Sequence, residues 1–217
     1  MSGRKSEKEY EQDLLDIWDK YIEPAYKNKP SYYIEDKSNC ANDTVEYIVL
    51  CESPHKDEVK LKTPLVGKSG TAVSEFLFYN DKKSIGEWIK EDYQKEESKK
   101  ELPFMAIVNV CNVPLQKISK NKRDIKGLNL NYVRDNCKTI TKLKDNLKER
   151  LSQYTNARTI IVCGEFAQAY YDEIKTNFPV IKPLYVPHPS RNQWRFVYEH
   201  KDDISTLKWI FDKKEKG

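Results

Sequence analysis

Four short runs of apolar, mostly β-branched residues divide this sequence, and each is followed by residues that typically begin a turn or a helix. The runs occupy residues 46–51, 104–110, 159–163 and 184–186. Apolar residues on both faces of such a run indicate a strand that is covered on both sides, as in a parallel sheet between helices. The sequence therefore predicts a parallel sheet of four strands.

The segments between these runs repeat their apolar residues with helical spacing. Helices are predicted at about 6–26 and around 73–77, 133–151, 166–174 and 204–211. Strands that alternate with helices through right-handed crossovers build an α/β fold. We expect a three-layer α/β/α sandwich with a central four-stranded parallel sheet.

The chain is long enough for one domain, and no repeat or Gly/Ser/Pro-rich linker divides its 217 residues. We expect a single domain over 1–217, with a core at about 46–191 and terminal helices at about 6–26 and 200–213 packed on it. No apolar run approaches the roughly 20 residues that a membrane helix needs. The charged start, residues 1–8, lacks the apolar stretch of a signal peptide. A monomeric cytoplasmic protein with no membrane attachment is therefore expected.

Charge and cysteine usage exclude few classes of function. The net charge of +4 permits a nucleic-acid partner without requiring one. The five cysteines are scattered and form no Cys-x-x-Cys pair, which argues against a disulfide framework or an ordinary zinc site. They are Cys40, Cys51, Cys111, Cys137 and Cys163. We expect reduced thiols near the core, no bound metal and no cofactor.

Unusual residues follow each predicted strand, at the edge where open parallel sheets bind ligands. They are Glu52, Ser53, Pro54 and His55 after the first run, Asn109 near the end of the second, Gly164 and Glu165 after the third, and His188, Ser190 and Arg191 after the fourth. A shielded Glu52 could activate water or stabilise a cation, although an isolated Glu is more often simply solvated. Asn109 could read a ligand's paired donor and acceptor, or could cap its own backbone.

Residues 65–70 read Leu-Val-Gly-Lys-Ser-Gly and look like part of a phosphate-binding loop. The glycine that the Walker pattern needs five residues before Gly67 is replaced by Lys62, so a nucleotide triphosphatase is disfavoured. Three residues, Gly67, Ser69 and Gly70, would still expose amides at a helix N-terminus, where Lys68 could help to hold a phosphate or another anion. A plain helix cap by Ser69 or Thr71 is the alternative.

The order of these motifs resembles the uracil-DNA glycosylase superfamily. The matching segments are Glu-Ser-Pro at 52–54, Pro-Leu-Val-Gly-Lys-Ser-Gly at 64–70, Asn-Val at 109–110, Ile-Val-Cys-Gly-Glu-Phe-Ala at 161–167 and His-Pro-Ser at 188–190. They are most similar to the branch whose first motif reads Gly-Glu-Ala-Pro-Gly. The resemblance implies that fold, and hydrolysis of the N-glycosidic bond of uracil or another damaged base in DNA, as in base excision repair.

The resemblance also implies a role for each matching residue. Glu52 would activate water, Asn109 would read the edge of a flipped-out base, and His188 would stabilise negative charge on the leaving base. The residues expected to bind the base are Ser53, Pro54, His55, Leu65 and Asn109. Those expected to bind the DNA backbone are Gly67, Lys68, Ser69, Gly70, Ser190 and Arg191.

Several residues depart from that branch. Cys51 and His55 replace glycines of the first motif, and Leu65 replaces the phenylalanine that stacks on the base. Some branches hold a catalytic Asp or Asn where this chain has Ser53. The branch's iron–sulfur cluster is not expected because, although Cys137 matches one ligand, the N-terminal Cys-x-x-Cys pair is missing. These departures keep a second function open: a non-catalytic module that binds nucleic acid or a nucleotide through the same pocket.

Overall fold

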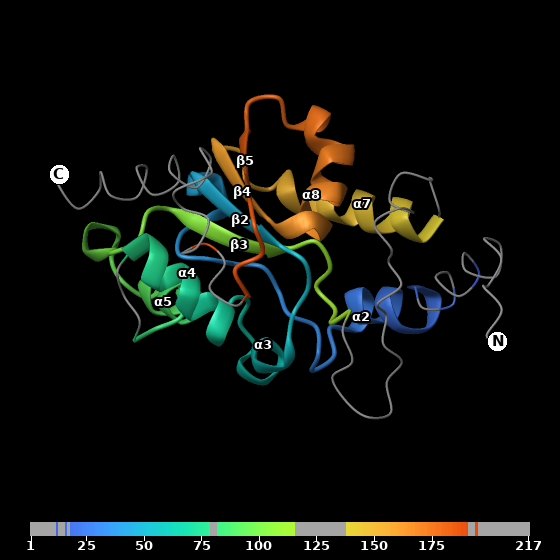
Figure 1. Cartoon of the computed structure of the whole chain (residues 1–217), viewed down its shortest axis with the longest axis horizontal. Coiled ribbons are helices and arrows are strands. Elements are labelled where there is room, and N and C mark those ends of the chain that lie inside the picture. Colours follow the sequence, from blue (N-terminus) through green and yellow to red (C-terminus); the bar gives the residue numbers. More distant parts are fainter. Residues whose placement is uncertain are drawn as a thin grey trace.

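The computed structural model describes residues 18–78, 82–115 and 138–190, together with residues 12, 16 and 194. The predicted C-terminal helix, about half of the predicted N-terminal helix, Cys137 and Arg191 lie outside the described residues. Within them, the chain forms a mixed α/β fold around one sheet (Figure 1).

The sheet has five strands in the order β1-β3-β2-β4-β5. They are β1 (Lys37–Ser38), β2 (Tyr47–Cys51), β3 (Met105–Asn109), β4 (Thr159–Cys163) and β5 (Lys182–Val186). Strands β2 to β5 are parallel and correspond to the four predicted runs. The prediction of four strands was incomplete, because the short β1 pairs antiparallel with β3 at the edge. This two-residue strand is half-buried and has no apolar run to reveal it.

The strand register aligns the carboxyl ends of the parallel strands. Cys51 of β2 pairs with Asn109 of β3, and Cys163 of β4 pairs with Val186 of β5. The segments that follow these residues therefore leave the sheet along one edge. This edge is where the sequence predicted a ligand site.

Helices lie on both faces of the sheet (Figure 1). Alternating side chains of the strands pack against them. On one face lie α2 (Glu23–Asn28), α7 (Lys138–Leu151) and α8 (Gly164–Ile174). On the other face lie α4 (Lys68–Phe78) and α5 (Ile85–Tyr93). In α7, leucines at 143, 147 and 151 form the buried stripe that the helical spacing predicted.

The remaining elements are short. They are the π-helical turn Trp18–Ile22, the helix α3 (Lys56–Leu61) and the 3-10 turns Asn42–Thr44, Glu97–Lys99 and Lys175–Asn177. Helices α3 and α5 were not predicted from the sequence. Across the described ranges, none of the helices combines the length and hydropathy needed to cross a bilayer.

Four cysteines within the described residues are buried free thiols: Cys40, Cys51, Cys111 and Cys163. This confirms the expectation of reduced thiols near the core for these four positions. Two of them, Cys51 and Cys163, lie at the carboxyl ends of neighbouring strands, where their mutual contact and then burial raise the pKa of the Cys51 thiol. A buried thiol with a raised pKa is a packing residue rather than a nucleophile.

Candidate active site

A cavity of about 470 Å³ lies at the carboxyl end of β2, within the size range of small-molecule sites. Nine of the predicted site residues line it: Glu52, Ser53, Pro54, His55, Leu65, Lys68, Ser69, His188 and Ser190. They come from three stretches that are far apart in sequence, namely the segment after β2, the start of α4 and the segment after β5. The fold thus brings most of the predicted residues to one place.

The other predicted residues have different positions. Gly67 and Gly70 do not line the cavity but shape the turn into α4. Gly67 has a positive φ of 82°, and a Cβ on Gly70 would lie 1.7 Å from the Leu65 carbonyl oxygen. Helix α4 begins at Lys68, so Thr71 lies inside its first turn, where its hydroxyl donates to the Gly67 carbonyl at 3.1 Å. Lys68 and Ser69 therefore present the N-terminus of α4 to the cavity.

Glu52 follows the last residue of β2 directly. Its carbonyl oxygen accepts the N–H of Cys111 at 3.1 Å, which extends the pairing with the β3 segment beyond the strand itself. Burial raises the pKa of the Glu52 carboxyl. A carboxylate with a raised pKa holds a proton more tightly, so Glu52 is better suited to accept a proton from water than a fully solvated Glu.

His188 is held in one orientation by its own loop. The backbone N–H of Ser190 donates to Nδ1 of His188 at 3.2 Å, so in the neutral ring the proton is carried by Nε2. Burial, and then the nearby His55, lower the pKa of His188 and favour this neutral form. The cavity therefore offers an Nε2–H donor on His188 and a carboxyl group on Glu52.

The backbone around His188 leaves it little freedom. Gly164, the first residue of α8, has a φ of 83°, and a Cβ there would lie 3.0 Å from Cβ of His188. On the other side, the indole N–H of Trp194 donates to the carbonyl oxygen of Pro187 at 2.6 Å. Close packing, rather than proline alone, fixes the position of this imidazole.

Asn109 lies at the end of β3, next to Cys51, which lines the cavity. It is 2% exposed, and its Oδ1 atom is buried with no hydrogen-bond partner. Alternation along β3 places its side chain on the same face as Ile107, the face covered by α4 and α5. Asn109 does not itself line the cavity, and its Oδ1 does not cap its own backbone. A buried acceptor without a partner costs about 1–3 kcal/mol, so this oxygen calls for a donor that the described residues do not supply.

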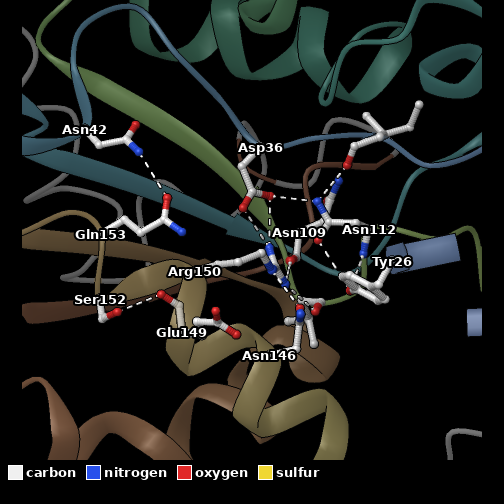
Figure 2. A network of polar contacts seen from close by, with 12 residues as sticks. Tyr26, Asp36, Asn42, Asn109, Asn112, Asn146, Glu149, Arg150, Ser152 and Gln153 are labelled. Atoms are coloured by element: carbon white, nitrogen blue, oxygen red, sulfur yellow. Dashed lines mark hydrogen bonds and ion pairs between the residues drawn. The ribbon is translucent and has the colours of Figure 1, made fainter. Parts of the chain in front are cut away.

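A buried charge pair supports the backbone of Asn109 from the opposite face (Figure 2). Arg150 of α7 binds both carboxylate oxygens of Asp36, at 3.0 and 2.8 Å. Its other terminal nitrogen donates to the carbonyls of Asn109 and Val110, at 2.8 and 2.9 Å. Asp36 also accepts from the side-chain amide of Asn112 at 3.1 Å. One helix thereby ties the end of β3 to the segment before β1.

Sequence reasoning missed Glu58, which also lines the cavity. Its two oxygens accept the backbone N–H groups of His55 and Leu65, each at 2.5 Å. Burial raises the pKa of Glu58 to about 7. The spacing of a helix-starting His55 and a Glu three residues later is that of a capping box, which could have identified this residue. No comparable signal marks Arg150, whose partner is 114 residues away.

Comparison with known proteins adds little to this geometry. No protein-family model matches the chain, and no curated protein matches it significantly. A solution NMR structure from Methanosarcina acetivorans, provisionally described as a uracil DNA glycosylase, aligns with 83% of this chain and 99% of that one. The TM-score is 0.44 and the sequence identity is 12%. That similarity is too low to carry a functional conclusion, which rests instead on the residues of the site.

Proposed function

We propose that this protein is a DNA glycosylase of the uracil-DNA glycosylase type, which hydrolyses the N-glycosidic bond of uracil or another damaged base. The observation that carries the proposal is the meeting of Glu52 and His188 at one cavity. The unpartnered amide oxygen of Asn109 beside it supports the same interpretation. A monomeric, cytoplasmic state stays a prediction.

The two cavity residues suit the charges that develop as a glycosidic bond breaks. The sugar becomes a cation and the departing base becomes an anion. In the proposed reaction, Glu52 orients the attacking water or stabilises the sugar cation, and its raised pKa helps it to take the water's proton. His188 donates its Nε2–H to the base as negative charge develops there.

Recognition of the substrate would precede this step. A base must leave the helical stack to reach the cavity, which costs a few kcal/mol. Contacts of the DNA backbone with Lys68 and Ser69 at the start of α4 would offset that cost, because a helix N-terminus attracts phosphate. The Oδ1 atom of Asn109 would accept a hydrogen bond from the edge of the flipped base.

A single-turnover assay tests this proposal. Excess protein is incubated with labelled single- and double-stranded oligonucleotides that carry uracil, hypoxanthine or xanthine, and alkali then reveals abasic sites. We expect cleavage that is lost in Glu52→Gln and His188→Ala. The matched control is Glu87→Gln, which changes a capping-box carboxylate of α5 that does not line the cavity.

One observation favours a second candidate. The imidazole of His55 lines the cavity, and Leu65 offers no aromatic face on which a base could stack. A non-catalytic module that binds nucleic acid or a nucleotide would tolerate both features. The same assay separates the two functions: no product on any substrate, together with intact and salt-sensitive DNA binding, would support the binding module and overturn the glycosylase.

A further inference from the structure

Glu58 connects two walls of the cavity, although the proposed chemistry does not use it. This residue of α3 is 7% exposed and is packed between the segment after β2 and the segment before α4. Oε2 accepts the N–H of His55 at 2.5 Å, and Oε1 accepts the N–H of Leu65 at 2.5 Å. We call this pair of hydrogen bonds the Glu58 bridge.

The turn at Leu65 forms one wall of the cavity, which we call the Leu65 wall, and its backbone needs such support. Leu65 has a φ of +49°, in the left-handed region that residues with a side chain seldom adopt. Its carbonyl accepts the N–H of Gly86 at 3.1 Å. A Cβ at Gly86 would lie 2.0 Å from the Pro64 carbonyl oxygen, so α5 presses closely on this turn. The Glu58 bridge holds the same turn through a carboxyl group that ionises near pH 7.

The segment at His55 forms a second wall of the cavity, which we call the His55 wall, and it is held at the start of α3. His55 is extended and precedes the first helical residue, so its N–H points away from the hydrogen bonds of the helix and needs a separate acceptor. Glu58, in the first turn, is that acceptor. His55 and His188 both line the cavity, and His55 contributes to the lowered pKa of His188.

We propose that Glu58 is a positioning residue that fixes the spacing of the His55 and Leu65 walls and thereby determines which base the cavity accepts. The inference rests on the proposed function, since those walls would enclose the flipped base. Hydrogen bonds to a carboxylate are roughly twice as strong as neutral ones, and water has little access to a buried carboxylate. Glu58 would act through two other residues and not on the reacting atoms.

Base selectivity is the first readout. Glu58→Gln places an NH₂ group against one of the two backbone N–H donors, which breaks the bridge at nearly constant volume. We expect the ratio of single-turnover rates on uracil and hypoxanthine to change by about 10- to 100-fold, the scale of a small misplacement in an active site. Loss of stability alone would lower both rates together. The matched control is Glu87→Gln, because Glu87 accepts the N–H of Ser84 at 3.0 Å in the same way.

NMR gives a second readout that needs no turnover. Burial raises the pKa of Glu58 to about 7, so the amide resonances of His55 and Leu65 should titrate with a midpoint near that pH. The other titratable groups that line the cavity are Cys51, Glu52, His55, Asp57, Lys68 and His188. We expect the shared midpoint to vanish in Glu58→Gln and to persist in Glu87→Gln.

The outcomes separate the two proposals. Suppose the wild-type protein cleaves no base, while the amide resonances of His55 and Leu65 still titrate with Glu58. The proposed function then fails, and the inference about base choice fails with it, although the two hydrogen bonds of the bridge are confirmed. If cleavage occurs but Glu58→Gln leaves the selectivity ratio and both amides unchanged, the inference is overturned and the glycosylase stands. Should Glu58→Gln not fold, Glu58→Asp takes its place, because it keeps the charge but is too short to span both amides.

Discussion

Arg150 donates a hydrogen bond of 2.8 Å to the main-chain carbonyl of Asn109, the residue whose own side-chain oxygen has no partner (Figure 2). The guanidinium is fixed in turn by the two oxygens of Asp36. The backbone of Asn109 is thus anchored from one face of the sheet, while its buried side chain lies on the other. The contact fixes the position of a side chain whose oxygen finds no donor among the described residues.

Removal of Arg150 should strongly destabilise the protein. In Arg150→Met the partly buried Asp36 carboxylate loses its cationic partner and keeps only the hydrogen bond from Asn112. Breaking a fully buried pair costs about 3–5 kcal/mol, which sets the upper end of the expected loss. Urea unfolding gives the free energy of unfolding. The double variant Arg150→Met/Asp36→Asn should recover part of the loss because no unpaired charge remains. Equal stability of the single variant and the wild type would contradict a structural role for this pair.

Gly164→Ala should impair His188 without touching it directly. The residue has a φ of 83°, which costs a non-glycine residue about 1–3 kcal/mol, and the new Cβ would press on Cβ of His188. We expect lower thermal stability and a slower single-turnover rate. If the rate effect is transmitted through the imidazole, the NMR resonances of the His188 ring should shift in Gly164→Ala, because the new Cβ displaces its Cβ. A slower rate with unshifted His188 resonances would point to another route.

The cleavage rate should fall as the pH decreases from neutral. Glu52 acts when ionised, and because burial raises its pKa, protonation begins at a higher pH than for a solvated Glu. Burial lowers the pKa of His188, so its ring becomes charged at a lower pH than a solvated His, and we assign the acid limb to Glu52 because it is the proposed proton acceptor. Single-turnover rates against pH test this assignment. An acid limb that persists in the residual activity of Glu52→Asn would assign it to another group.

The parallel strands could be predicted because they carry apolar residues on both faces, a pattern that few other elements share. The edge strand β1 could not, since Lys37 and Ser38 have neither length nor apolar character. The short helices α3 and α5 lack a long periodic stripe. In α5 the capping box of Ser84 and Glu87 was the available signal.

The part of the site that could be predicted consists of residues that come directly after the parallel strands. The rule that ligands bind there grouped Glu52 with His188, and the fold brings both to one cavity, although their roles stay predictions. The supporting contacts depend on tertiary structure. Arg150 and Asp36 are 114 residues apart, and nothing in the sequence pairs them. The left-handed backbone of Leu65 is likewise set by its neighbours, not by its own propensity.

Lys68→Ala should weaken DNA binding in a salt-dependent way. Lys68 is exposed at the start of α4 and lines the cavity, so it is placed to contact a backbone phosphate. Losing one such contact should reduce the slope of log K against log salt by about 1. The matched control is Lys182→Ala, because Lys182 is exposed at the amino end of β5, away from the ligand edge. Equal slopes for the two variants would remove Lys68 from the phosphate site.

Glu58 should make the wild-type protein less stable as the pH rises. Its pKa is about 7 in the folded state against about 4.5 when unfolded, so the folded protein holds the proton more tightly. The stability contributed by the protonated carboxyl is fully present below the unfolded pKa of about 4.5 and is lost as the pH rises through about 7. The loss can reach about 3 kcal/mol, since each pKa unit is worth about 1.4 kcal/mol.

Glu58→Gln isolates this contribution, because glutamine does not titrate. The free energy of unfolding of the wild type minus that of the variant, measured by urea unfolding at several pH values, should decrease between pH 4.5 and 7. Glu87→Gln serves as the control. Its carboxylate has a lowered pKa, because the Ser84 hydroxyl and N–H donate to it, so its contribution appears above its unfolded pKa and is lost in acid. A difference that stays constant between pH 4.5 and 7 for Glu58→Gln would mean that the buried carboxyl ionises at its ordinary pH.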